Sequence, residues 1–208
     1  MNVLELFAGS CIMSETAKEL GHITFAVDKE PFEKVDLVKD IEFLEPDDIP
    51  FAPDVIWASP PCQSYSICGC VAHRKDTVAF SEFGKKSDRL VIKILEIIKH
   101  FNCIYFIENP RAVLRKMPFM FGIPKQTIWY CTYGDRSAKP TDIFSNHIYS
   151  LFNRNGWVPR PECHNGNKHC HHESAPRGSK TGTQGKINNY ERSKLPKELC
   201  KEILESLK

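Results

Sequence analysis

The sequence lacks the features of a membrane or secreted protein. No apolar run approaches the ~20 residues that a membrane-spanning helix needs, so we expect no membrane partner. No signal peptide precedes the first strand-like residues, which favours a cytoplasmic location. The net charge is only +2, so no overall field indicates a nucleic-acid partner, although residues 154–194 are locally rich in Lys, Arg and His.

The cysteines do not form the pattern of a disulfide framework. There are nine, an odd number, and Cys62, Cys68 and Cys70 fall within one short segment. We therefore expect reduced thiols, some of which serve in catalysis or bind a metal.

Apolar runs of strand length alternate with segments of helical periodicity. Ser14 is expected to cap the first helix and Gly21 to end it. Alternating strands and helices predict right-handed βαβ crossovers, hence an α/β fold whose mostly parallel sheet has helices on both faces. Strands are expected at 2–8, 23–28, 54–59, 103–109 and 125–134, and helices at 13–20, 87–101 and 195–208.

The periodic pattern is interrupted once. We expect a catalytic domain over 1–144, a small irregular Cys/His-rich insert over 145–190 that is rich in Gly, Pro and Asn, and a C-terminal segment, 191–208, that completes the catalytic domain. No internal repeat is present.

Polar residues stand where several of the expected strands end, which is where open parallel sheets bind ligands. Gly9 lets the backbone approach a ligand, and Asp28, 19 residues later, is placed to accept hydrogen bonds from ribose hydroxyls. A single glycine, in place of a G-x-G-x-x-G motif, suits a ligand without a pyrophosphate, such as S-adenosyl-L-methionine. An ordinary βα turn without a ligand is the alternative.

Two prolines lead into Cys62. Pro60 and Pro61 restrict the backbone and hold the thiol at the open end of the sheet, as a nucleophile requires. The alternative is a buried cysteine that only packs. Because the thiolate is the reactive form, we expect the site to lower a thiol pKa of about 8.5. Glu108, at the end of the following strand, is expected to be a proton donor.

In this order, the segments resemble the motifs of the cytosine-C5 DNA methyltransferase family, in particular its small, phage-type members. "LELFAGS", "AVDKEP" and "KDI" are similar to the first three motifs, "SPPCQSYS" to the catalytic fourth, and "SDRLVIKILEII" and "FIENP" to the fifth and sixth. "ERSKLPKELCKEI" lies where the last motif returns to the cofactor pocket. The resemblance implies a Rossmann-like methyltransferase fold, S-adenosyl-L-methionine as cofactor and DNA as partner. The sequence does not give the oligomeric state, for which we favour a monomer, and a viral protein would lie in the host-cell cytoplasm.

The resemblance also implies which residues form the site. Cys62 would add to C6 of a flipped cytosine, Glu108 would donate to N3, and C5 would then accept the methyl group. The cofactor residues would be Phe7, Ala8, Gly9, Ser10, Asp28, Lys29, Asp40, Ile41 and Pro60, and the catalytic residues Pro61, Cys62, Gln63, Glu108, Asn109 and Arg136.

The sequence departs from the family pattern in two places. Pro110 stands where valine is usual, and no Gln-x-Arg-x-Arg motif follows, so Arg136 or Lys139 would take the role of the base-contacting arginine. Two other functions are consistent with the same motifs. Related enzymes methylate cytosine in transfer RNA with a Pro-Pro-Cys motif, and a non-catalytic DNA-binding relative would keep the fold.

Arg177 and Lys180 are expected to contact phosphates.

The insert contains a concentration of metal-ligand residue types. "CHNGNKHCHH" places two cysteines and four histidines within residues 163–172. A structural zinc ion takes four N or S ligands in a tetrahedron. We expect Cys163, Cys170 and a histidine, either His171 or His172, as ligands, with Cys131 as the fourth. A solvated His-rich loop is the alternative.

Overall fold

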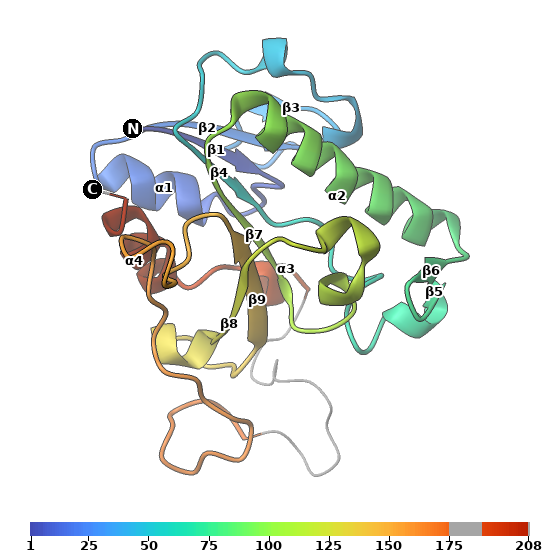
Figure 1. Cartoon of the computed structure of the whole chain (residues 1–208), viewed down its shortest axis with the longest axis vertical. Helices are drawn as coiled ribbons and strands as arrows, with labels where there is room; N and C mark the ends of the chain where they lie inside the picture. The colour runs from blue at the N-terminus through green and yellow to red at the C-terminus, as the bar shows by residue number, and fades with distance from the viewer. Residues whose placement is uncertain (175–188, 208) are drawn as a thin grey trace.

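The computed structural model describes residues 1–174 and 189–207, in which a seven-stranded sheet lies between two layers of helices (Figure 1). The strand order is β3-β2-β1-β4-β7-β9-β8. The strands are β1 (Asn2–Leu6), β2 (Ile23–Asp28), β3 (Leu37–Val38), β4 (Val55–Ala58), β7 (Ile104–Pro110), β8 (Lys125–Trp129) and β9 (Pro140–Ser145), with a separate hairpin of β5 (Arg74–Lys75) and β6 (Val78–Ala79). The helices are α1 (Ile12–Glu19), α2 (Glu82–Phe101), α3 (Asn189–Ser193) and α4 (Lys197–Glu205).

Side chains alternate across the central strands, and each face has its own core. On one face, Leu4 and Leu6 of β1 pack with the apolar side of α2, including Val91 and Ile94. On the other face, Val3 packs with residues of α1 and α4, as expected when successive side chains of a strand point to opposite faces. Figure 1 shows α2 on one side of the sheet and α1 with α4 on the other. The expectation of a sheet covered on both faces is confirmed.

The start of α1 differs from the sequence expectation. The helix begins at Ile12, so Ser14 lies inside it and is not its cap. Cys11 precedes the helix in the left-handed conformation, at φ 53°, and makes no side-chain cap. Instead the buried carboxylate of Glu5, on β1, accepts a hydrogen bond of 2.8 Å from the Ser14 amide. Burial raises the pKa of Glu5 to about 7.

At one edge of the sheet, neighbouring strands run antiparallel. The first five strands of the order are parallel, whereas β9 runs antiparallel to both β7 and β8. β9 was not expected from the sequence. The strand expected at 125–134 is also shorter, because the chain leaves the sheet after Trp129 and forms a 3₁₀ turn, η6 (Tyr130–Tyr133), which ends at Gly134 with φ 85°.

The described part of the insert has little regular structure. From residue 146 to residue 174 the only pairing is an isolated bridge between Ile148 and Trp157. Arg177 and Lys180, expected to contact phosphates, lie outside the described residues. None of the helices in the described ranges has the length and hydropathy of a membrane span.

Candidate active site

A cavity of about 970 Å³ opens where β1, β2, β4 and β7 end. Its size is within the usual range for small-molecule sites, and its position is where parallel sheets bind ligands. Of the residues predicted from the sequence, the cavity is lined by Phe7, Gly9, Ser10, Asp28, Lys29, Asp40, Ile41, Pro60, Pro61, Cys62, Gln63 and Glu108. Ala8, Asn109 and Arg136 are not among its lining residues.

Asp28 forms one end of this cavity together with the turn after β1. Its nearly buried carboxylate accepts N–H bonds from Gly9, at 2.9 Å, and from Glu30, at 3.0 Å. The turn is tight, because Phe7 and Gly9 both have positive φ, 57° and 48°. A carboxylate has about four acceptor positions, so Asp28 keeps capacity for two hydroxyl groups. Ala8 is buried behind the turn, where its N–H donates to the Val27 carbonyl.

A second carboxylate lies near this end. Asp40 accepts a hydrogen bond of 2.6 Å from Lys86 Nζ, which together with the Glu42 amide lowers the Asp40 pKa despite partial burial. Ile41 beside it is buried and apolar. Two carboxylate acceptors, the Phe7 ring and an aliphatic surface are the groups that an adenosyl ligand requires, so these residues fit S-adenosyl-L-methionine.

The backbone before Cys62 is held from the neighbouring strand. Asn109, fully buried on β7, donates from Nδ2 to the Pro60 carbonyl at 3.1 Å. The Cys62 carbonyl then accepts the amides of Tyr65, at 3.0 Å, and Ser66, at 2.7 Å. Asn109 therefore lies outside the cavity and supports the proline segment that positions the thiol.

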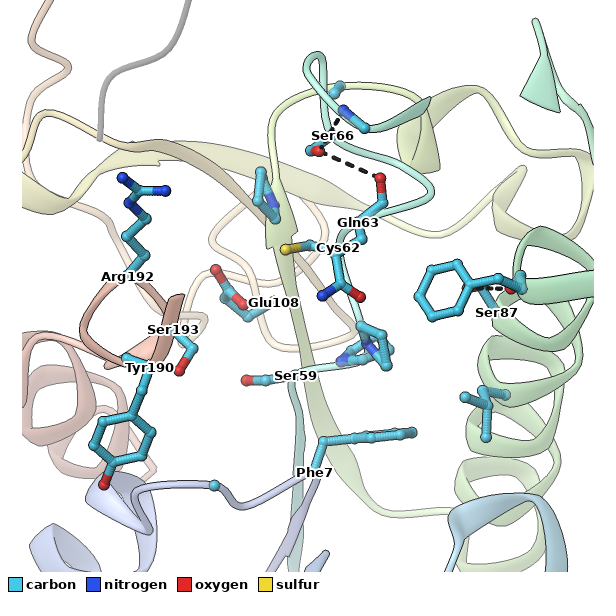
Figure 2. A pocket seen from close by; sticks show the side chains of 18 of the residues that line it. Phe7, Ser59, Cys62, Gln63, Ser66, Ser87, Glu108, Tyr190, Arg192 and Ser193 are labelled. Carbon is cyan, nitrogen blue, oxygen red and sulfur yellow. Dashed lines mark hydrogen bonds between the residues drawn. The ribbon is translucent and has the colours of Figure 1, made fainter. Parts of the chain in front are cut away.

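The thiol of Cys62 and the carboxyl group of Glu108 face the same space (Figure 2). Burial raises the pKa of the Cys62 thiol above its usual value; the charge of Lys139 opposes this effect, and that of Glu108 adds to it. The expectation that the site lowers this pKa is therefore wrong for the free protein, because desolvation outweighs the lysine charge.

Glu108 contacts Tyr130 and Lys139, and of these two residues only Lys139 was considered a site residue from the sequence. It is nearly buried, and its Oε1 accepts the Tyr130 hydroxyl at 2.8 Å and lies 3.5 Å from Lys139 Nζ. The ammonium group of Lys139 also lies 4.2 Å from the centre of the Tyr130 ring. Tyr130 was not predicted to belong to the site, because its segment was expected to continue a strand.

The Arg136 side chain does not belong to the arrangement of Glu108, Tyr130 and Lys139. Its side chain is exposed and forms an ion pair with Glu173 of the insert. Lys139, the alternative considered for the same role, lines the cavity next to Glu108. The polypeptide turns between the two residues, where Asp135 accepts the amide and hydroxyl of Ser137.

The helix α3 adds side chains that no sequence motif identified individually. Tyr190, Arg192 and Ser193 line the cavity, and Figure 2 shows them on the side opposite Gln63. The Tyr190 ring stacks on Phe32, with centroids 6.0 Å apart. The sequence signal was the segment "ERSKLPKELCKEI", which contains Arg192 and Ser193 and directly follows Tyr190.

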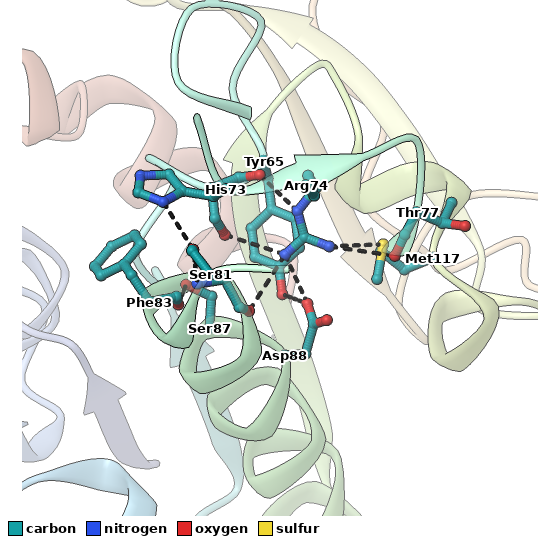
Figure 3. A network of polar contacts seen from close by, with 11 residues as sticks. Tyr65, His73, Arg74, Thr77, Ser81, Phe83, Ser87, Asp88 and Met117 are labelled. Carbon is teal, nitrogen blue, oxygen red and sulfur yellow. Dashed lines mark hydrogen bonds and ion pairs between the residues drawn. The ribbon is translucent and has the colours of Figure 1, made fainter. Parts of the chain in front are cut away.

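The loop that follows Cys62 is fixed to α2 by a buried arginine (Figure 3). Arg74 donates to the Ser64 carbonyl at 2.7 Å and to Asp88 at 2.8 Å. Its guanidinium lies 4.4 Å from the centre of the Tyr65 ring, and the Tyr65 hydroxyl donates to the same Asp88. Residues two and three positions after Cys62 are thereby tied to a long, well-packed helix.

The expected metal ligands come together outside the cavity. The ligand atoms of Cys131, Cys163, Cys170 and His172 all lie within 4.8 Å of one another. His171 does not belong to this cluster, because it is exposed and its Nε2 contacts the Asp135 carbonyl at 3.1 Å. We refer to the four clustered residues as the Cys/His group.

A profile of the family described as C-5 cytosine-specific DNA methylase matches residues 1–117. Two similar solved structures are a mutant of Spodoptera frugiperda DNMT2, 19% identical with a TM-score of 0.49, and S. pombe Dnmt2 methyltransferase, 17% identical with a TM-score of 0.45. The matches cover 77% and 70% of this chain and 55% and 48% of those chains, so the chain spans about half their length. No curated protein sequence matches.

Proposed function

The chain belongs to the C-5 cytosine-specific DNA methylase family, and from this premise we propose that it methylates C5 of cytosine in DNA with S-adenosyl-L-methionine as methyl donor. One observation carries the proposal. Cys62 and Glu108 line the same cavity as Asp28 and Phe7, so a nucleophile, a proton donor and a nucleoside-binding carboxylate share one space.

Cys62 supplies what cytosine C5 lacks. C5 is too weak a nucleophile to take a methyl group unaided. Addition of the Cys62 thiolate to C6 forms an S–C6 bond and makes C5 an enamine carbon, while Glu108 donates to N3, where negative charge builds up. After methylation, C5 loses its proton and the S–C6 bond breaks, which restores the aromatic ring and the free thiolate.

The charges around Cys62 link these proton movements. Ionised Glu108 raises the pKa of the Cys62 thiol, whereas Lys139 lowers it. A proton on Glu108 therefore favours both the donation to N3 and the thiolate that attacks C6. Lys139, held over the Tyr130 ring, takes the place of the family arginine beside the base.

The cofactor would be held at the other end of the cavity. Asp28 would accept the ribose hydroxyls and Asp40 the adenine amino group, with Phe7 and Ile41 against the ring. When bound, S-adenosyl-L-methionine supplies an electrophilic methyl group. The cavity volume of about 970 Å³ leaves room for a pyrimidine as well, and the base would have to leave its stack to enter.

The test is methyl transfer from labelled S-adenosyl-L-methionine to duplex DNA, with transfer RNA as the competing substrate. Wild-type protein and Cys70→Ser should label DNA, because Cys70 does not line the cavity. Cys62→Ala should not label it. Label on transfer RNA alone would replace the proposed substrate with RNA, and no label on either would leave a non-catalytic nucleic-acid-binding protein.

A further inference from the structure

The Cys/His group lies where the insert meets the turn after β8. Cys131 belongs to η6, whereas Cys163, Cys170 and His172 come from a segment without helix or strand. Among the described residues, the apolar cluster at this junction consists of Trp129, Ala138 and three of the cysteines. Trp157 and Arg160 anchor the part of the insert that precedes Cys163. The cluster itself gives residues 163–172 little apolar burial, which indicates that another interaction holds them.

The geometry of the group is close to that of a tetrahedral metal site. Ligand atoms at ~2.0–2.3 Å from a zinc ion lie roughly 3.3–3.8 Å from one another. Cys163 Sγ and His172 Nδ1 are 3.7 Å apart, and no separation within the group exceeds 4.8 Å. Small side-chain rotations would bring all four atoms onto one ion.

The surroundings of His172 and Cys163 also indicate a ligand. The His172 side chain is nearly buried, and its Nδ1 lies 3.7 Å from the Cys163 sulfur. A thiol is a weak hydrogen-bond partner, so an ion bound at Nδ1 would stabilise the buried imidazole. Asn167 Nδ2 donates to Cys163 Sγ at 3.5 Å, as outer groups do to metal-bound thiolates.

We propose that Cys131, Cys163, Cys170 and His172 bind a structural zinc ion that fastens the insert to η6. Three thiolates and one imidazole, with no fifth ligand, form the donor set of a closed structural zinc site. The cysteines would bind the ion as thiolates, so zinc binding would release their thiol protons.

The zinc ion also supports the catalytic groups, an inference that rests on the proposed function. Tyr130 immediately precedes Cys131, and its hydroxyl donates to Glu108. Lys139 follows Ala138 of the same small cluster, and its backbone has φ 27°, a conformation that the surroundings must enforce. An ion at Cys131 therefore fixes the turn from which both Tyr130 and Lys139 extend to Glu108.

The first test measures metal and needs no activity. Full-length protein purified without chelators should contain about one zinc ion per chain by mass spectrometry. Cys163→Ala should lose it, and Asn167→Ala should weaken zinc affinity by about 10- to 100-fold. His172→Ala should also lose zinc, His172→Cys should retain it through a fourth thiolate, and His171→Ala is the matched control that should keep it.

Cobalt reconstitution of the wild-type protein keeps the test valid if an alanine variant does not fold. Tetrahedral thiolate ligation should give strong visible bands and sulfur-to-cobalt charge transfer. Absence of bound zinc and cobalt, or equal zinc loss in His171→Ala and His172→Ala, would overturn the site.

The second test distinguishes zinc binding from methyl-transfer activity. Protein stripped by a chelator should lose methyl transfer but still bind S-adenosyl-L-methionine, because Asp28 lies at the other end of the cavity, and zinc should restore transfer. Zinc-loaded protein without methyl transfer would refute the proposed function and leave the site standing. Full transfer by zinc-free protein would refute the support of Tyr130 and Lys139.

Discussion

Replacing Lys139 by methionine tests the electrostatic arrangement around Glu108. The two side chains are almost fully buried, and Lys139 Nζ lies 3.5 Å from Glu108 Oε1. At that distance and an effective dielectric constant of ~20, the attraction is about 5 kcal/mol. Methionine keeps the length of the side chain, and of the two partners described above it leaves Glu108 with the Tyr130 hydroxyl.

Breaking a buried pair by removing one partner costs about 3–5 kcal/mol, because the other charge stays buried. We therefore expect Lys139→Met to lower the free energy of unfolding by about this amount at pH 8.

Urea unfolding at pH 8, followed by fluorescence, would measure this loss. In a Glu108→Gln background, Lys139→Met removes the second charge of the pair and leaves neither buried, so it should destabilise much less. Lys139→Arg, which keeps a cation, is the control for the loss of charge. A cost below about 1 kcal/mol at pH 8, typical of an exposed pair, or an equal cost in both backgrounds, would refute the reasoning.

Two further predictions concern groups beneath the cavity. Burial raises the Glu5 pKa from 4.5 to about 7, so wild-type stability should fall as pH rises from about 4.5 to about 7. Glu5→Gln, which can still accept the Ser14 amide, should be more stable at pH 8 by about 3 kcal/mol in urea unfolding; equal pH profiles for both proteins would contradict this. Arg74→Met should lower the methyl-transfer rate and the stability together, because the loop after Cys62 loses its attachment to Asp88, and Asp88→Asn in the same chain should restore part of the stability. Unchanged kinetics in Arg74→Met would show that this attachment does not position the loop.

The parallel half of the sheet was predictable from the sequence. Each of β1, β2, β4 and β7 is a short, mostly buried apolar run followed by a polar residue or a turn, a strong local signal. The antiparallel edge was not predictable, because β9 begins at Pro140 and lies within a polar segment without alternation. Its pairing with β7 and β8 is a long-range contact that local patterns do not encode.

The site residues at the ends of the parallel strands were also predictable from the sequence. Residues at strand ends converge because parallel strands share one edge, and so Asp28, Cys62 and Glu108 meet. Which residue of a turn points inward depends on side-chain direction. The choices between Lys139 and Arg136, and between His172 and His171, could not be made before the turn and the insert were seen to fold against each other.

The covalent bond between Cys62 and cytosine C6 is the central claim, and trapping tests it most directly. Fluorine at C5 cannot leave as a proton does, so duplex DNA containing 5-fluorocytosine should hold the protein in a complex that survives denaturing electrophoresis. Wild-type protein and Cys70→Ser should form this complex in the presence of S-adenosyl-L-methionine, and Cys62→Ser should form none. A complex of equal yield with Cys62→Ser would contradict the assignment of the nucleophile.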